Sequence, residues 1–177
     1  MNNNKNLTTT LSAIPPIAQM RKNHALEHTT INLLESAAPQ KGFSGWSIHN
    51  GFWILGHCDI QTIQETVDLA LAKLRNGQKQ LAIHPSCGTN LMMSGLLTAI
   101  GALVTLRGTK KESERISRLS SLVLVSGAML QLSKPLGPWV QANITVDPDM
   151  TGMSVIGIDA GEIGSVPCYF VRTELKA

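Results

Sequence analysis

The sequence predicts an α+β protein, with a small sheet of two β-hairpins, two helices, and an apolar helical hairpin that spans the membrane. Three observations predict this class: alternating apolar runs around short turns, two stretches with helical spacing of apolar residues, and a central region almost without charge. The 177 residues are enough for one well-buried core. The predicted order is a disordered arm over 1–16, an α/β metal-site half over 17–90, the apolar hairpin over 91–134, and a β-hairpin over 135–177 that returns to the same α/β domain.

Composition narrows the class of partner and the compartment. The net charge is only +3, no basic tract occurs, and the aromatic residues are few, so we expect no nucleic-acid partner. The first sixteen residues carry one lysine and no apolar run, which is not the pattern of a secretory signal, and we expect the soluble part to be cytoplasmic. Three scattered cysteines are too few for a disulfide framework, which also favours a reducing compartment.

The N-terminal elements follow from their start and stop signals. Pro15-Pro16 precede a helical apolar pattern that ends before Pro39. Asn50-Gly51, between two apolar runs, predicts a β-hairpin with a two-residue turn. A second helix follows, capped by Asp59 or Thr62 and ended by Asn76-Gly77.

Two later segments complete the α/β part. LAIHPSCGTN, at 81–90, predicts a short strand or extended piece that breaks into a turn at Pro85. The runs Met153–Ile158 and Val166–Arg172, with a glycine-containing bend between them, predict the second β-hairpin.

The central region predicts the membrane hairpin. Residues 91–106 and 119–133 contain no Asp, Glu, Lys or Arg, and Lys134 follows the second stretch. A helix that crosses a bilayer needs about 20 apolar residues, so both stretches suit a membrane-spanning hairpin with lipid as its partner. The alternative is a buried core hairpin in a soluble α/β protein. Small residues are spaced for close contact between the two helices: Ser94, Thr98 and Ala102 in the first, Ser121, Ser126 and Gly127 in the second.

The first helix carries a candidate metal site in His24-Ala25-Leu26-Glu27-His28. The two histidines are four residues apart and share one helix face, an arrangement that suits tetrahedral Zn²⁺. Glu27 is adjacent to that face and has two interpretations: a catalytic general base, or a hydrogen-bond partner that orients an imidazole.

A third ligand is available in His84-Pro85-Ser86-Cys87. Imidazole and thiolate both bind zinc, so His24 and His28 with His84, Cys87 or both would make a metal site. Four protein ligands would close the site and indicate a structural metal, whereas three would leave a position for catalysis. The alternative is that His84 only ends a strand and Cys87 is a small buried hydrophobe. Weaker candidates are the exposed His49 and the pair His57-Cys58, and Cys168 is expected to pack in the last strand.

Two resemblances bear on these residues. HALEH resembles the HxxEH motif of inverzincin metallopeptidases, which implies that Glu27 is the general base. The further glutamate of the inverzincin ligand set has no counterpart in the apolar stretch 91–106. The combination of NHALEH, IHPSCGTN, an apolar hairpin and LGPWVQ is similar to an uncharacterised family of small bacterial membrane proteins, largely cyanobacterial. That resemblance implies that the candidate ligands belong to one sequence signature and that the apolar hairpin is a regular feature of the family.

The sequence therefore predicts a membrane-anchored zinc-binding protein, with a metallopeptidase-like hydrolase acting on peptides as its enzymatic interpretation. One alternative is a non-catalytic membrane assembly or scaffold protein that binds protein partners and holds a structural metal. The other alternative is a soluble α/β binding module without metal.

Overall fold

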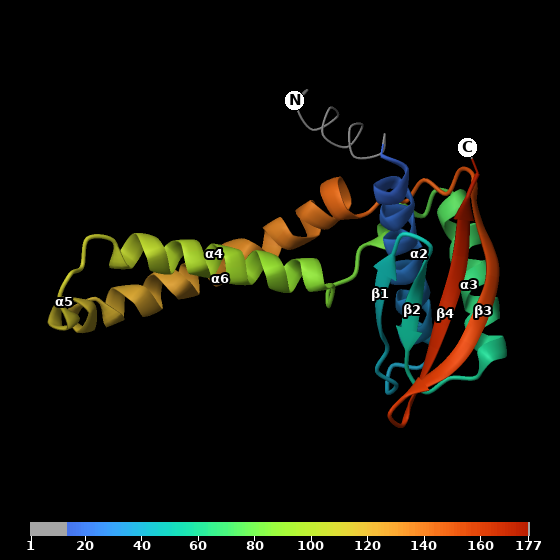
Figure 1. The fold of residues 1–177 in the computed structure, drawn as a ribbon, viewed down its shortest axis with the longest axis horizontal. Helices are drawn as coiled ribbons and strands as arrows, with labels where there is room; N and C mark the ends of the chain where they lie inside the picture. Colours follow the sequence, from blue (N-terminus) through green and yellow to red (C-terminus); the bar gives the residue numbers. More distant parts are fainter. Residues whose placement is uncertain (1–13, 177) are drawn as a thin grey trace. The chain divides into compact units, whose positions relative to one another are not determined.

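The computed structural model describes residues 14–176, so residues 1–13 of the predicted arm lie outside the described part (Figure 1). The chain forms two compact units, one of residues up to His84 together with those from Ala142 onward, and one of Pro85–Gln141. The elements in chain order are helix α2 (Pro15–Ala37), strands β1 (Ser44–Ile48) and β2 (Gly51–Leu55), helix α3 (Ile60–Arg75), the 3-10 helix η1 (Lys79–Ala82), helices α4 (Gly88–Leu106), α5 (Glu112–Ser117) and α6 (Leu119–Val140), the π-helical turn η2 (Gln141–Thr145), and strands β3 (Met153–Ile163) and β4 (Val166–Leu175). The predicted α+β class is confirmed.

The two predicted β-hairpins join into one antiparallel sheet of order β1-β2-β4-β3. They meet where β2 pairs with β4, and Phe52 lies opposite Val171. Side chains alternate between the faces of a strand, so Phe52, Ile54 and Val171, all fully buried, point to the same side. Helices α2 and α3 cover that side of the sheet (Figure 1).

The core between the sheet and the helices follows the helical spacing that the sequence predicted. Ile63, Val67 and Leu74 of α3 are buried together with Leu26 and Ile31 of α2. Each large apolar side chain buried in this way contributes about 1.5–3 kcal/mol relative to leaving it exposed. This packing, rather than helix propensity, fixes α2 against the sheet.

The ends of α3 are as predicted. The Asp59 carboxylate accepts hydrogen bonds from the backbone N–H of Thr62 at 2.8 Å and from its hydroxyl at 2.7 Å. These bonds satisfy a donor of the first helical turn and lower the pKa of Asp59. Gly77, at φ +81°, follows Asn76 at the other end and adopts the left-handed conformation that favours glycine.

The turn of the first β-hairpin differs from the prediction. Ile48 pairs with Gly51, so the two turn residues are His49 and Asn50 rather than Asn50 and Gly51, and neither has a positive φ. The turn is held from outside the hairpin. The amide of Asn23 donates to the carbonyl of Ile48 at 2.8 Å and to that of His49 at 3.2 Å. Tertiary hydrogen bonds therefore decide a turn that the Asn-Gly pattern placed one residue too late.

The segment before His84 is also not a strand. Lys79–Ala82 form η1, and the following residues are irregular. The Asn32 amide of α2 donates to the carbonyls of Leu81 at 2.8 Å and Ile83 at 3.1 Å. These carbonyls would face a neighbouring strand in a sheet, but here they are satisfied by a helix side chain, which explains why the expected strand does not form.

A third segment, 144–149, runs along the N-terminal half of α2. The Arg21 guanidinium donates from Nε to the Ile144 carbonyl at 2.7 Å and from Nη2 to the Val146 carbonyl at 3.2 Å. The Lys22 ammonium lies 3.8 Å from the Asp147 carboxylate, in a largely buried pair. One helix therefore holds chain segments from both halves of the sequence.

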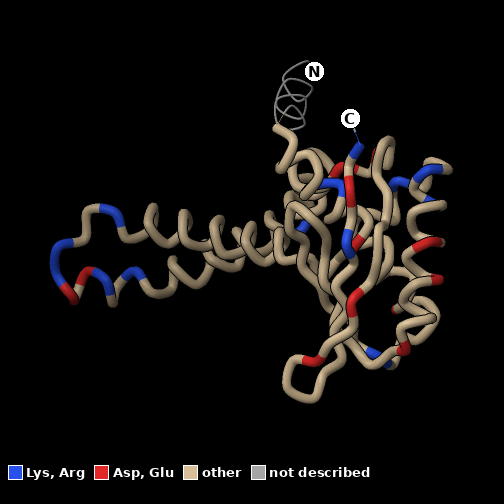
Figure 2. The backbone as a smooth tube through the Cα atoms, turned by 45° about the vertical axis from the view of Figure 1, so that its right-hand side comes forward, with Lys and Arg blue, Asp and Glu red and all other residues tan. Residues whose placement is uncertain are grey.

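The second unit consists of α4, α5 and α6. Within the described residues, two helical stretches are long and apolar enough to cross a membrane, Gly88–Leu106 and Leu119–Thr145. Their outward side chains are strongly exposed, with Leu91 at 77% and Leu124 at 75%. The charged residues of this unit gather at the turn between the helices (Figure 2). The hairpin is therefore not buried as a protein core.

The helices α4 and α6 touch along a line of small and polar residues. The hydroxyls of Ser94 and Ser133 lie 2.8 Å apart. A Cβ at Gly101 would lie 2.8 Å from Cγ of Met129, and one at Gly137 would lie 2.3 Å from Oδ1 of Asn90. Close approach at small residues with polar cross-links is the usual way that apolar helices pair in lipid.

Part of this interface differs from the predicted one. Ser94 lies at the contact as expected, but on α6 the contact uses Ser133 and Gly137, whereas Ser121 is exposed and Gly127 has open space around it. Helix α6 also continues beyond Lys134, through Pro135 and Pro138, to Val140. Prolines are tolerated in apolar helices because neighbouring groups satisfy the freed carbonyls. The predicted hairpin ended at Lys134 because the uncharged stretch ends there, whereas the helix itself continues past this charge.

Candidate metal centre

The two histidines of the HALEH motif lie side by side on α2. Their ring centroids are 4.2 Å apart, as the spacing of four residues predicts for a shared helix face. His28 is 2% exposed and His24 is half-buried. The pair is thus built into the surface of the core rather than displayed on a solvated helix.

Each of these imidazoles has one nitrogen tied to a backbone carbonyl. Nδ1 of His24 lies 3.0 Å from the Thr145 oxygen, and Nδ1 of His28 lies 2.8 Å from the Ala82 oxygen. A carbonyl can only accept, so Nδ1 carries the proton in both rings, and the lone pair of the neutral imidazole is on Nε2. Histidines that bind metals typically have this hydrogen bond from the other ring nitrogen, because it fixes the tautomer and the ring orientation.

His84, a predicted ligand, lies next to this pair. Its ring centroid is 5.8 Å from that of His28, and its Nε2 lies 3.2 Å from the Glu35 carboxylate. Glu35 was not predicted as part of the site. It follows His28 by seven residues, two helical turns, so it lies on the same face of α2, and that spacing could have indicated it.

Glu27 points to the sheet. Its carboxylate accepts a hydrogen bond from the Ser47 hydroxyl at 2.5 Å and is 4% exposed. A Cβ at Gly45 would lie 2.9 Å from its Oε1, so this close approach requires glycine in β1. Burial raises the pKa of Glu27, while the Ser47 hydrogen bond and the charges of His24 and His84 lower it in part.

Cys87 is buried and lies at the N-cap of α4, where its sulfur accepts a hydrogen bond from the Thr89 backbone N–H at 3.4 Å. Within the described residues, His24, His28 and Cys87 form a group that could bind a metal ion. His84 is not a member of that group. It contacts the same face of α2 through its interaction with Glu35.

The weaker candidates lie elsewhere. His49 and His57 are exposed, Cys58 is half-buried against the core with its carbonyl accepting from the Tyr169 hydroxyl, and Cys168 is buried in β4 as expected. None of these four residues belongs to the metal-binding group.

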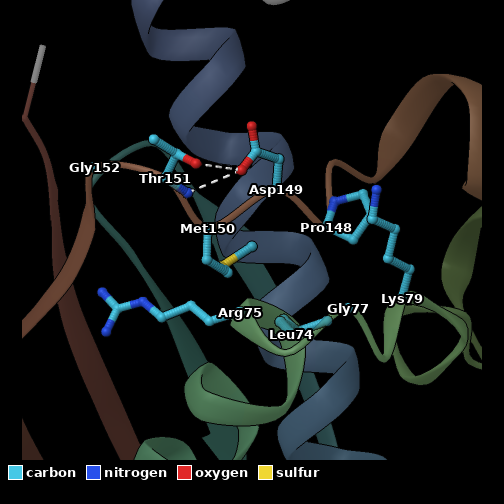
Figure 3. Close-up of a pocket in the computed structure, with 9 residues that line it drawn as sticks. All are labelled: Leu74, Arg75, Gly77, Lys79, Pro148, Asp149, Met150, Thr151 and Gly152. Carbon is cyan, nitrogen blue, oxygen red and sulfur yellow. Dashed lines mark hydrogen bonds between the residues drawn. The ribbon is translucent and has the colours of Figure 1, made fainter.

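A separate cavity of about 390 Å³ lies between the end of α3 and residues 148–152, and it contains none of the predicted ligands (Figure 3). Two of its charged groups, Arg75 and Asp149, are already engaged. The Arg75 guanidinium donates to the Met153 carbonyl at 2.7 Å, and Thr151 donates to the Asp149 carboxylate from both its N–H and its hydroxyl. These bonds from Thr151 lower the pKa of Asp149. The cavity is therefore not an extension of the histidine site.

Fold and site together define a small α+β protein with an apolar helical hairpin and a His/Cys group that could hold a metal. The chain belongs to the family described as a domain of unknown function, DUF6391, whose model matches residues 19–158. An uncharacterized protein of the cyanobacterium Picosynechococcus sp. is 29% identical over 181 residues, which cover 95% of this chain and 87% of that protein. No solved structure matches the chain. The predicted resemblance to an uncharacterised, cyanobacterial family is thus confirmed.

Proposed function

We propose that the protein is a membrane-anchored zinc-binding protein in which His24 and His28 are two ligands and Cys87 is the third. The observation that carries this proposal is the pair of Nδ1 hydrogen bonds to the carbonyls of Thr145 and Ala82. Those bonds present both Nε2 lone pairs from one face of α2. A helix with incidental histidines has no need of this arrangement on two successive turns.

Zinc is the metal that the donor set favours. Neutral imidazole and thiolate are ligands of intermediate and soft character, which suit Zn²⁺ better than Mg²⁺ or Ca²⁺. We assign His84 to a supporting position, because its Nε2 is engaged with Glu35 and it lies outside the group of three. Three protein ligands leave one coordination position open, as in catalytic zinc sites.

A hydrolase is the second candidate function, favoured by the electrostatic interaction of Glu27 with the histidines. This carboxylate is buried and interacts electrostatically with both His24 and His84. Bound zinc would act as a Lewis acid toward a peptide carbonyl and toward water. Glu27 would take up the proton at its carboxylate, with the Ser47 hydroxyl holding that carboxylate in place. In the non-catalytic alternative, Glu27 only anchors α2 to β1.

Metal content and peptide hydrolysis test both candidates in one set of variants. The wild-type chain purified without chelators should contain about one zinc ion per chain by mass spectrometry, and His24→Ala should contain less than about a tenth. His49→Ala is the matched control, because His49 is exposed and outside the group, and it should keep the wild-type content.

Glu27→Gln separates catalysis from a structural metal. It should keep the zinc and lose peptide hydrolysis. Wild-type protein that contains zinc but hydrolyses no peptide would support the structural interpretation, and wild-type protein without zinc would contradict both.

We also propose that α4 and α6 cross the bilayer as a hairpin. With a rise of about 1.5 Å per residue, helices of 19 and 22 residues are close to the roughly 30 Å thickness of the hydrocarbon core. Their outward apolar side chains are exposed, so a bilayer would remove this surface from water. The alternative of a soluble binding module would leave this apolar surface exposed to water.

Carbonate extraction tests the hairpin. The wild-type chain should remain in the membrane pellet. Leu96→Glu/Leu130→Glu should release it, because each charge near the middle of a membrane helix costs about 2.5–3.5 kcal/mol. Ile116→Glu/Ser117→Glu, at the exposed turn, is the control and should stay in the pellet. Release of the wild-type chain would contradict the membrane proposal.

A further inference from the structure

The turn of the helical hairpin is strongly basic. Between α4 and α6 the chain carries two carboxylates, Glu112 and Glu114, and a cluster of cations, here called the basic tip: Arg107, Lys110, Lys111, Arg115 and Arg118. The rest of the hairpin unit adds only Lys134, so the charge of this unit is concentrated at the turn (Figure 2).

The two carboxylates at the turn offset only part of the charge of the five cations. Glu114 accepts hydrogen bonds from the backbone N–H groups of Lys110 at 2.9 Å and Lys111 at 3.3 Å, which lower its pKa. It therefore serves the backbone of the turn. Among the described residues, the ion pairs all lie outside the turn.

Other hydrogen bonds give the turn a defined shape. The Arg118 guanidinium donates to the carbonyls of Thr105 at 2.8 Å and Arg107 at 3.1 Å, which are acceptors left over at the end of α4. Arg118 thus joins the end of α4 to the start of α6. The side chains of Lys110, Lys111 and Arg115 are left to face a partner from a fixed backbone.

A cavity of about 560 Å³ opens at this turn, and its lining is amphiphilic. Lys110 and Arg115 contribute cationic groups, and Glu112 contributes one carboxylate. The remaining lining is apolar and comes from Leu106, Ile116, Leu119 and Leu122. Ile116 is 61% exposed, a large apolar surface to leave in water beside so many charges.

We propose that the basic tip binds an anionic phospholipid, with its phosphate between Lys110 and Arg115 and part of an acyl chain along Ile116 and Leu122. Charge complementarity favours an anionic headgroup over a zwitterionic one, and the apolar part of the lining favours a lipid over free phosphate. The proposal rests on the hairpin crossing the bilayer, because that places the turn at the depth of the headgroups. It is independent of the metal site.

Lipid retention by the full chain tests this site. Detergent-purified protein is titrated with dioleoyl phosphatidylglycerol, dioleoyl phosphatidylcholine or glycerol 3-phosphate, and bound ligand is counted by native mass spectrometry. Phosphatidylglycerol should be retained in preference to both others. Lys110→Gln/Arg115→Gln should weaken its binding about 30-fold, which corresponds to about 1 kcal/mol for each cation near a lipid surface.

The controls distinguish specific binding at the basic tip from nonspecific electrostatic attraction to the protein. Lys41→Gln/Lys73→Gln removes the same charge from outside the hairpin and should bind as wild type. Ile116→Ser should weaken phosphatidylglycerol and leave any glycerol 3-phosphate binding unchanged. Equal retention of the two lipids, or binding unaffected by Lys110→Gln/Arg115→Gln, would overturn the proposal. Preferential binding of glycerol 3-phosphate would contradict the lipid proposal and indicate that the site binds a soluble phosphate compound. A chain that stays in the carbonate pellet yet shows no lipid preference refutes this site alone.

Discussion

We expect zinc chelation to lower the thermal unfolding temperature of the wild-type chain by about 10 °C or more, and His28→Ala to abolish this response. A metal that binds only the folded chain stabilises it by about 4 kcal/mol when its free concentration is a thousandfold above Kd. His28 is nearly inaccessible and bonded to the Ala82 carbonyl at 2.8 Å, so its loss removes both a proposed ligand and a hydrogen bond between α2 and η1. The hydrogen bond alone contributes about 1 kcal/mol.

The metal-dependent and metal-independent parts of this effect can be separated. His28→Ala should unfold at a lower temperature than the wild type and at the same temperature with and without chelator. His57→Ala, which removes an exposed histidine of the same unit, should match the wild type under both conditions. If chelation leaves the wild-type unfolding temperature unchanged, no stabilising metal is bound at this site.

The second large effect is expected at Gly137 of α6. A Cβ there would lie 2.3 Å from Oδ1 and 3.2 Å from the backbone Cα of Asn90. The Asn90 side chain cannot move away cheaply, because its Oδ1 accepts from the Gln141 amide at 2.7 Å. Gly137→Leu should therefore separate α4 from α6 at this end and destabilise the hairpin by about 3 kcal/mol, from overpacking and the lost hydrogen bond together.

Gly127→Leu is the matched control, because it adds the same side chain to the same helix at a position with open space around the Cβ. It should unfold in detergent at the wild-type temperature, whereas Gly137→Leu should unfold several degrees lower, as about 3 kcal/mol implies. Equal unfolding temperatures for the two variants would show that the helices do not pair through Gly137.

Two features were predictable because the spacing of their residues is local. His24 and His28 share a face by helix geometry, and Asp59 caps α3 through a hydrogen bond three residues away. The partners that orient the site were not predictable in this way. The carbonyls of Ala82 and Thr145 are distant in sequence from the histidines they bind, and a backbone carbonyl leaves no mark in residue type.

The differences in the fold have the same origin. The hairpin turn moved to His49-Asn50 because Asn23, on another element, supplies its hydrogen bonds. The expected strand near His84 became η1 because Asn32 binds its carbonyls. Local patterns predicted the elements, whereas side-chain to backbone bonds across the fold decided where they begin and turn.

Helix α2 also forms hydrogen bonds with both chain segments that lead to the hairpin unit. Two covalent connections lead to the hairpin unit, one after η1 and one before Val146. Side chains of α2 form hydrogen bonds with the backbone at both. His28 bonds to the Ala82 carbonyl, and His24 and Arg21 bond to carbonyls of residues 144–146. Displacement of either segment would therefore break a hydrogen bond to an imidazole, so the orientation of both histidines depends on how the two connecting segments are held.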